Sequence, residues 1–179
     1  MSSKTTVTVF SKVTLMLLGP SSKLDLRRRI KEALVKKGYE DGNIIIMETI
    51  KDDEHYFDKK FGNILDKYRP LLFFAFFHKN EKMHGVIFEL GWICGEYSRV
   101  EISERLRIVS EIDYGYKHTT RYIQSILHTS QELPVEKMNI KQISQCIHDN
   151  VDFSLNRWKS LSGLTDDEFF MKLVESDRR

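Results

Sequence analysis

The strongest constraint on the fold is the run of consecutive apolar residues at Leu71–Phe77. A surface helix or a half-exposed strand mixes apolar and polar positions, whereas a strand that is covered on both faces stays apolar throughout. Such a strand is typical of a parallel sheet between two layers of helices. The run is also far too short to span a bilayer, which takes about 20 apolar residues. We therefore expect a buried strand and no contact with a membrane.

Two more strands are predicted before this run, and a helical pattern follows each of them. Val13–Leu18 is a short apolar stretch that ends at Gly19-Pro20, and Asn43–Met47 is rich in isoleucine. After both strands, apolar residues recur at helical spacing. They are Leu26, Ile30, Ala33 and Leu34 in the first helix and Phe57, Phe61, Ile64 and Leu65 in the second.

After the third strand, the sequence predicts a helix from about Gly85 to Tyr97 and a weaker strand at Arg105–Val109. Alternating strands and helices, joined by right-handed crossovers, give a doubly wound parallel sheet. We therefore predict an α/β fold of three layers. Its first strand should lie between the second and the third.

The pattern becomes helical toward the C-terminus. Ile140–Trp158 carries the spacing of a long amphipathic helix, and Thr165–Glu168 has the sequence of a capping box. Thr119 or Thr120 is placed to cap another helix, which would carry Ile123, Ile126 and Leu127. We expect a single domain over residues 7–179. A parallel-sheet core should occupy 7–112, and additional helices should form an extension over 113–179.

Composition narrows the class of protein. A chain of 179 residues suits one core, and a net charge of +2 gives no reason to expect nucleic acid as a partner. Cys94 and Cys146 have no second cysteine or histidine at metal-ligand spacing, so we expect no metal and no other cofactor.

The N-terminus has no apolar signal segment, which favours a cytoplasmic protein. The basic stretch Lys23–Lys37 is either a solvated helix face or a contact for a phosphate-bearing ligand or a partner.

In doubly wound sheets, ligands bind outside the carboxyl ends of the strands, at the point where the strand order reverses. The segments Gly19–Lys23 and His78–His84 should border that crevice. Gly19, Pro20, Ser21 and Ser22 form a tight turn with two hydroxyls and free backbone donors ahead of a helix, which suits a phosphate or sugar oxygen. The turn lacks the spacing of a P-loop or a dinucleotide fingerprint, so its signal is weak.

The segment His84–Glu96 is the most informative for function. Val86, Leu90, Ile93, Cys94 and Tyr97 form one predicted buried stripe, and Gly85, Glu89, Trp92 and Glu96 lie at its flank. A carboxylate at Glu89 that is partly removed from water is suited to act as acid, base or nucleophile. The alternative is a glutamate that only complements the helix dipole. Gly91 and Gly95 each cost the helix about 1 kcal/mol, which favours a close approach of a ligand or another backbone.

Other side chains near this segment have two interpretations each. His84 is either an ordinary loop histidine or a group that orients a substrate or exchanges a proton. Trp92 is either part of the core or a surface on which a nucleobase stacks. Asp113–His118 is either a surface turn or a loop that closes on a ligand. Glu96 lies about 10 Å along the helix from Glu89, too far for a retaining carboxylate pair.

A strand that ends in Gly19-Pro20, followed two strands later by Gly85-x-x-Phe88-Glu89-Leu90-Gly91, resembles the nucleoside 2-deoxyribosyltransferase family. That family belongs to a flavodoxin-like group that includes nucleotide N-glycosidases and is similar to TIR-type NAD-cleaving domains. The resemblance covers about Val13–Val109. It implies cleavage of an N-glycosidic bond, with Glu89 as the nucleophile and the turn at Gly19-Pro20 near the sugar.

The sequence departs from the family before Gly85, where Asn80–His84 contains no aspartate to handle the base. This departure favours a hydrolase that acts on a nucleotide, or a protein that only binds one, over base exchange. We therefore expect a nucleoside- or nucleotide-directed N-glycosidase or (deoxy)ribosyltransferase. The alternatives are a sensor of a nucleotide-derived ligand and a protein–protein adaptor. The resemblance also implies at least a homodimer, for which the helix at Ile140–Trp158 offers a contact.

Overall fold

The computed structural model describes residues 9–47, 61–68, 72–78, 81–111, 131–136, 139–165, 168–169 and 171–172. Two of the sequence predictions lie outside the described residues. They are the loop at Asp113–His118 and the helix that would carry Ile123, Ile126 and Leu127.

The described elements alternate between strands and helices along the chain. The strands are β1 (Leu15–Leu18), β2 (Ile44–Ile46), β3 (Leu72–Phe77), β4 (Leu106–Glu111) and β5 (Gln131–Val135). The helices are α1 (Leu24–Val35), α2 (Gly62–Tyr68), α3 (His84–Glu96), α4 (Arg99–Arg105) and α6 (Ile140–Ser162). Three short 3-10 helices, η1 (Val9–Lys12), η2 (Ser21–Lys23) and η3 (Asp41–Asn43), join them.

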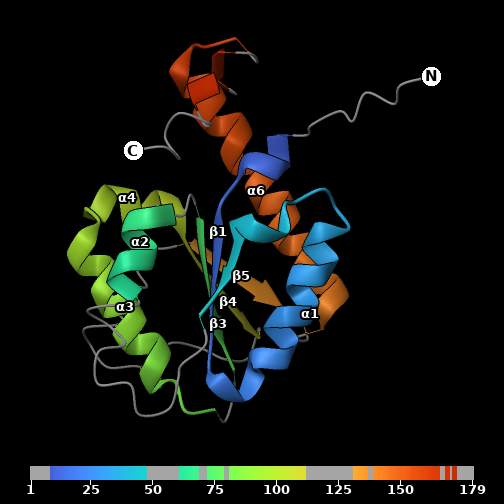
Figure 1. Cartoon of the computed structure of the whole chain (residues 1–179), viewed down its shortest axis with the longest axis vertical. Helices are drawn as coiled ribbons and strands as arrows, with labels where there is room; N and C mark the ends of the chain where they lie inside the picture. Colours follow the sequence, from blue (N-terminus) through green and yellow to red (C-terminus); the bar gives the residue numbers. More distant parts are fainter. Residues whose placement is uncertain are drawn as a thin grey trace.

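The five strands form one parallel sheet in the order β2-β1-β3-β4-β5. Strand β1 lies between β2 and β3, so the chain reverses direction across the sheet after β2. Helices α1 and α6 cover one face, and α2, α3 and α4 cover the other (Figure 1). The predicted three-layer, flavodoxin-like α/β fold is thereby confirmed.

The apolar runs of the strands build two separate cores, one on each face of the sheet. In β3, Phe73, Ala75 and Phe77 belong to the cluster that includes α3. Phe74 and Phe76 point the other way, into the cluster that includes α1 and α6. All six residues of β3 are buried, as expected for a strand with helices on both sides.

The part of the chain after residue 112 differs from the prediction of a purely helical extension. Strand β5 belongs to the sheet and pairs with β4 from Arg107↔Gln131 to Glu111↔Val135. Helix α6 is a layer of the fold, because its stripe of Ile143, Ile147 and Val151 is fully buried. This apolar stripe is therefore not available to an adaptor partner or to a second copy of the chain.

Two helix ends follow the local chemistry of the sequence. The Thr165–Glu168 capping box is confirmed, because the Thr165 amide donates to Glu168 Oε2 at 2.9 Å and the Glu168 amide donates to Thr165 Oγ1 at 3.4 Å. Helix α6 ends at Gly163, whose φ of 66° favours glycine. Among the described helices, none is both long and apolar enough to cross a membrane.

Candidate functional site

The turn after β1 and the loop after β3 lie side by side at the carboxyl edge of the sheet. Strands β1 and β3 are hydrogen-bonded neighbours, with Leu18 opposite Ala75. Beyond their ends, the Ser22 hydroxyl donates to Glu81 Oε2 at 2.7 Å, and Lys23 Nζ lies 3.0 Å from Glu81 Oε1. The hydrogen bond from Ser22, and then that from Lys23, hold the pKa of Glu81 below its usual value. These contacts join the two segments that border the topological switch point.

A buried arginine fixes the turn after β1. Arg27 is 2% exposed, and its Nη1 donates to the carbonyl oxygen of Pro20 at 2.8 Å. Its Nη2 donates to the carbonyl oxygen of Met47, just after β2, at 3.2 Å. A Cβ atom at Gly19 would lie 2.6 Å from Arg27 Nη1, so only glycine leaves room for the guanidinium. Arg27 belongs to the basic stretch Lys23–Lys37, which the sequence interpreted as either a solvated helix face or a contact for a ligand or partner. Its side chain is buried instead and binds main-chain carbonyls.

Glu89 is buried on α3, with only 3% of its surface exposed. The helix begins at His84, directly beyond the loop that follows β3, and Glu89 is its sixth residue. The predicted buried stripe is confirmed, because Val86, Leu90 and Ile93 are buried and Cys94 and Tyr97 pack against the same cluster. Glu89 therefore brings a carboxyl group into the protein in the second turn of the helix that follows the switch-point loop.

The other predicted residues differ in exposure. Ser21, Ser22, His84 and Gly85 are exposed, Gly19 is half-buried and Pro20 is buried. Trp92 is partly buried and packs against the core on the α3 side of the sheet. The exposed groups surround the turn and the helix start, whereas Trp92 contributes to the core.

The glycines of α3 do not accommodate a close backbone. A Cβ atom built at Gly85, Gly91 or Gly95 would meet nothing within 4 Å in the part of the chain that the structure describes. The predicted close approach of another backbone to Gly91 and Gly95 is therefore absent from this part.

His78 is a candidate that the sequence indicated only as the first residue of the segment His78–His84 beside the crevice. It follows β3 directly and is 6% exposed, and its Nε2 has no hydrogen-bond partner among the described residues. Burial lowers the pKa of His78, as do the nearby charges of Lys23 and Arg27, while Glu111 and Glu81 oppose them. The imidazole is therefore kept neutral near pH 7 and retains an acceptor or donor for a ligand. Its position directly after the apolar run was the available signal.

No group of three His, Cys, Asp or Glu side chains is placed to hold a metal ion within the described ranges. Comparison of the chain with known protein families, with curated proteins and with solved structures found no match.

Proposed function

We propose that the protein cleaves the N-glycosidic bond of a nucleoside or nucleotide, with Glu89 as the nucleophile. The observation that carries this proposal is the burial of Glu89, 3% exposed, on the helix that follows the switch-point loop. A glutamate that only complements the helix dipole acts from the first turn, because the effect falls off beyond that turn. Glu89 lies beyond the first turn and inside the protein, which favours a chemical role.

In the proposed reaction, a carboxylate oxygen of Glu89 attacks the anomeric carbon of the sugar. A C–O bond forms as the C–N bond breaks, and the base leaves with the electron pair and takes up a proton. Water then attacks the same carbon and releases the sugar and the free carboxylate. In the transfer variant, a second base replaces water.

The turn at Gly19–Ser22 supports the sugar end of this proposal. It lies at the carboxyl end of β1 and offers two exposed serine hydroxyls ahead of α1. The hydrogen bond between Ser22 and Glu81 joins it to the loop that leads into α3. A ligand bound here therefore contacts both segments of the switch point.

The proposal is tested by incubating the protein with nucleosides, nucleotides and NAD and following free base by chromatography. We expect release from at least one class and a loss of about 10³-fold or more in Glu89→Gln, because amides are poor nucleophiles. Glu96→Gln is the matched control, since Glu96 is an exposed glutamate near the end of the same helix. Release that is unaffected by Glu89→Gln contradicts the proposal.

The alternative functions give different results in the same experiment. Thermal stabilisation by one of these compounds, without base release and retained in Glu89→Gln, would identify a ligand sensor. The absence of both responses would reject a nucleotide-directed site. Light scattering tests the homodimer that the family resemblance implies, and a monomer at micromolar concentration would contradict it.

A further inference from the structure

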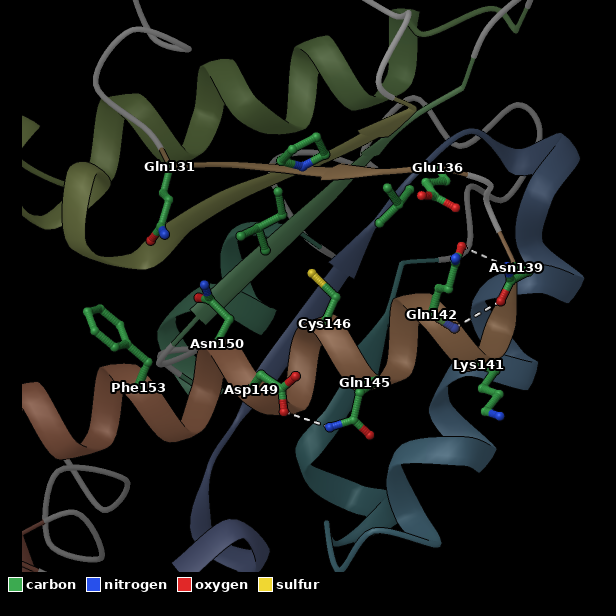
Figure 2. A pocket seen from close by; sticks show the side chains of 13 residues that line it. Gln131, Glu136, Asn139, Lys141, Gln142, Gln145, Cys146, Asp149, Asn150 and Phe153 are labelled. Carbon is green, nitrogen blue, oxygen red and sulfur yellow. Dashed lines mark hydrogen bonds between the residues drawn. The ribbon is translucent and has the colours of Figure 1, made fainter.

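A concave surface lies beside β5, at the opposite edge of the sheet from β2. It is a groove of about 1010 Å³ between β5 and α6 (Figure 2). Strand β4 separates β5 from β3, so this groove is remote from the switch point of β1 and β3. Its character is set by carboxamide side chains, which are Gln131, Asn139, Gln142, Gln145 and Asn150.

Asn150 is the most informative residue of this groove, because it is only 8% exposed and still lines the cavity. Its Oδ1 accepts a hydrogen bond of 2.7 Å from Arg107 Nε. Since a guanidinium only donates, the amide must direct its oxygen toward Arg107 and its NH₂ group away from it. Nδ2 has no hydrogen-bond partner among the described residues, which leaves a nearly buried donor directed at the groove.

Arg107 makes Asn150 Nδ2 a stronger hydrogen-bond donor. It is 4% exposed, and its other contacts are neutral acceptors, among them the carbonyl oxygen of Leu106 at 3.1 Å and Ser154 Oγ at 3.2 Å. Burial lowers the pKa of Arg107 to about 10, as does the charge of Arg157, so the group remains a cation at neutral pH. A cation bonded to the oxygen of an amide makes its N–H group a better donor. Asn150 therefore favours a ligand that places a hydrogen-bond acceptor next to Nδ2.

The main chain of β5 forms the other wall. Strand β5 is the terminal strand and pairs only with β4 in the described part of the sheet. An edge strand of this kind is able to pair with an added extended segment. Pro134 removes one donor from the edge, which restricts pairing to a short contact. Across the groove, Asn139 and Gln142 bond each other, and Gln145 bonds Lys37 and Asp149. Asn150 Nδ2 is then the donor that faces a main-chain carbonyl of an added segment.

The charges around the groove define the peptide further. Among the described residues, Glu136 and Asp149 line it together with one cation, Lys141. Glu132 on β5 and Asp152 on α6 are exposed beside them. Lys37 does not line the groove, but its Nζ donates to Gln145 Oε1 at 2.6 Å. Leu133, Pro134 and Val135 line it from β5, and Phe153, which is 57% exposed, adds an apolar contact at one end of the groove (Figure 2). An extended segment with a basic side chain and an apolar side chain matches this surface.

We propose that the groove between β5 and α6 binds an extended segment of a partner protein that carries Lys or Arg, with a main-chain carbonyl of the segment accepting a hydrogen bond from Asn150 Nδ2. This function is independent of the N-glycosidic chemistry proposed for Glu89.

The test is selection of a displayed random-peptide library on the full-length protein, followed by affinity measurement on the selected peptides. We expect enrichment of sequences that combine a basic residue with an apolar one. Asn150→Asp keeps the acceptor for Arg107 but removes the donor, so the fold is retained and affinity falls about tenfold or more. Phe153→Ala should also weaken binding. Leu161→Ala is the matched control, since Leu161 is exposed on the same helix outside the groove.

Cysteine labelling locates the bound peptide. Cys146 lines the groove, and Cys94 lies on α3 at the other face of the sheet. A selected peptide should protect Cys146 from maleimide and leave the labelling of Cys94 unchanged. The proposal is overturned if no sequence is enriched, if peptides bind folded Asn150→Asp as tightly as the wild type, or if Cys146 is not protected.

Discussion

Arg27 and Arg107 are 2% and 4% exposed, and they organise two regions of the sheet in different ways. At the carboxyl end of β1, Arg27 donates to the main-chain carbonyls of Pro20 and Met47. Between β4 and α6, Arg107 donates to the side chains of Asn150 and Ser154. The first arginine holds strand ends in place, whereas the second orients side chains on another layer.

The two regions therefore expose different chemical groups. Main-chain carbonyls fix Arg27 at the turn that contains Gly19 and Pro20, and the charge of Arg27 acts on the nearby His78. Asn150 is oriented by a cation and presents a donor to the groove. We propose a reaction at the first region and recognition of a partner at the second.

The largest effect on stability is expected from Arg107→Met. The substitution removes the donors to Asn150 Oδ1 and Ser154 Oγ and leaves buried acceptors unsatisfied. We expect a loss of about 3 kcal/mol in the free energy of unfolding, measured by urea denaturation. Arg105→Met is the control, because Arg105 is only half-buried and its guanidinium lies 5.8 Å from the ring centroid of Tyr97. If both variants lose the same free energy of unfolding, the contacts of Arg107 with Asn150 and Ser154 do not contribute more than those of Arg105.

Gly19→Ala tests the other region. The added Cβ atom would lie 2.6 Å from Arg27 Nη1 and 3.3 Å from its Cδ, and the guanidinium is held by two carbonyls. We expect a loss of about 2 kcal/mol in the free energy of unfolding, typical of overpacking. Gly91→Ala is the matched control. It should raise the free energy of unfolding by at most about 1 kcal/mol, because alanine favours the helix and its Cβ atom has no described neighbour within 4 Å. A Gly19→Ala protein as stable as the wild type would show that Arg27 is not fixed.

The lowered pKa of His78 leads us to expect that the stability of the protein depends on pH. The pKa of this side chain in the folded protein lies below the usual value for histidine of about 6.5, so the unfolded chain binds the proton more readily. Stability should be fully present above about pH 6.5 and fall on acidification, with a slope of at most about 1.4 kcal/mol per pH unit from this residue. Urea denaturation between pH 7 and 5 should show a shallower decline for His78→Gln. Parallel declines would contradict the burial of a neutral imidazole.

The smallest effect is expected from the contacts of Glu81 with Ser22 and Lys23. These groups lie at the surface, where solvent screens an ion pair. Glu81→Gln should barely change the thermal midpoint, and any change should disappear at high salt. A large, salt-independent loss would mean that the two loops depend on this contact, and that the switch-point region is less rigid than Arg27 implies.

The sequence predicted those parts of the fold that a continuous apolar pattern defines. β1, β3 and the stripe of α6 carry this pattern, and their alternation was sufficient for the strand order around β1. β5 was missed because only Leu133 and Val135 of its five residues are buried and Pro134 interrupts it, as suits an edge strand. Periodicity gives no information on such a strand.

The candidate site was predictable only in part. The burial of Glu89 followed from its place beside the stripe of Val86, Leu90 and Ile93 on α3. The roles of Arg27 and Arg107 were hidden because each depends on partners far along the chain, such as Met47 for Arg27 and Asn150 for Arg107. Local sequence shows the charge of an arginine but not the distant carbonyl or amide that allows its burial.

The most direct test of the proposed chemistry is to trap the glycosyl-enzyme. The protein is mixed with a nucleoside or nucleotide from which it releases base, quenched in acid within the first turnover, digested and mapped by mass spectrometry. The account predicts a pentosyl adduct on the peptide that contains Glu89, formed together with free base and absent from Glu89→Gln. Base release with no adduct on that peptide, or with the adduct on another residue, would contradict it.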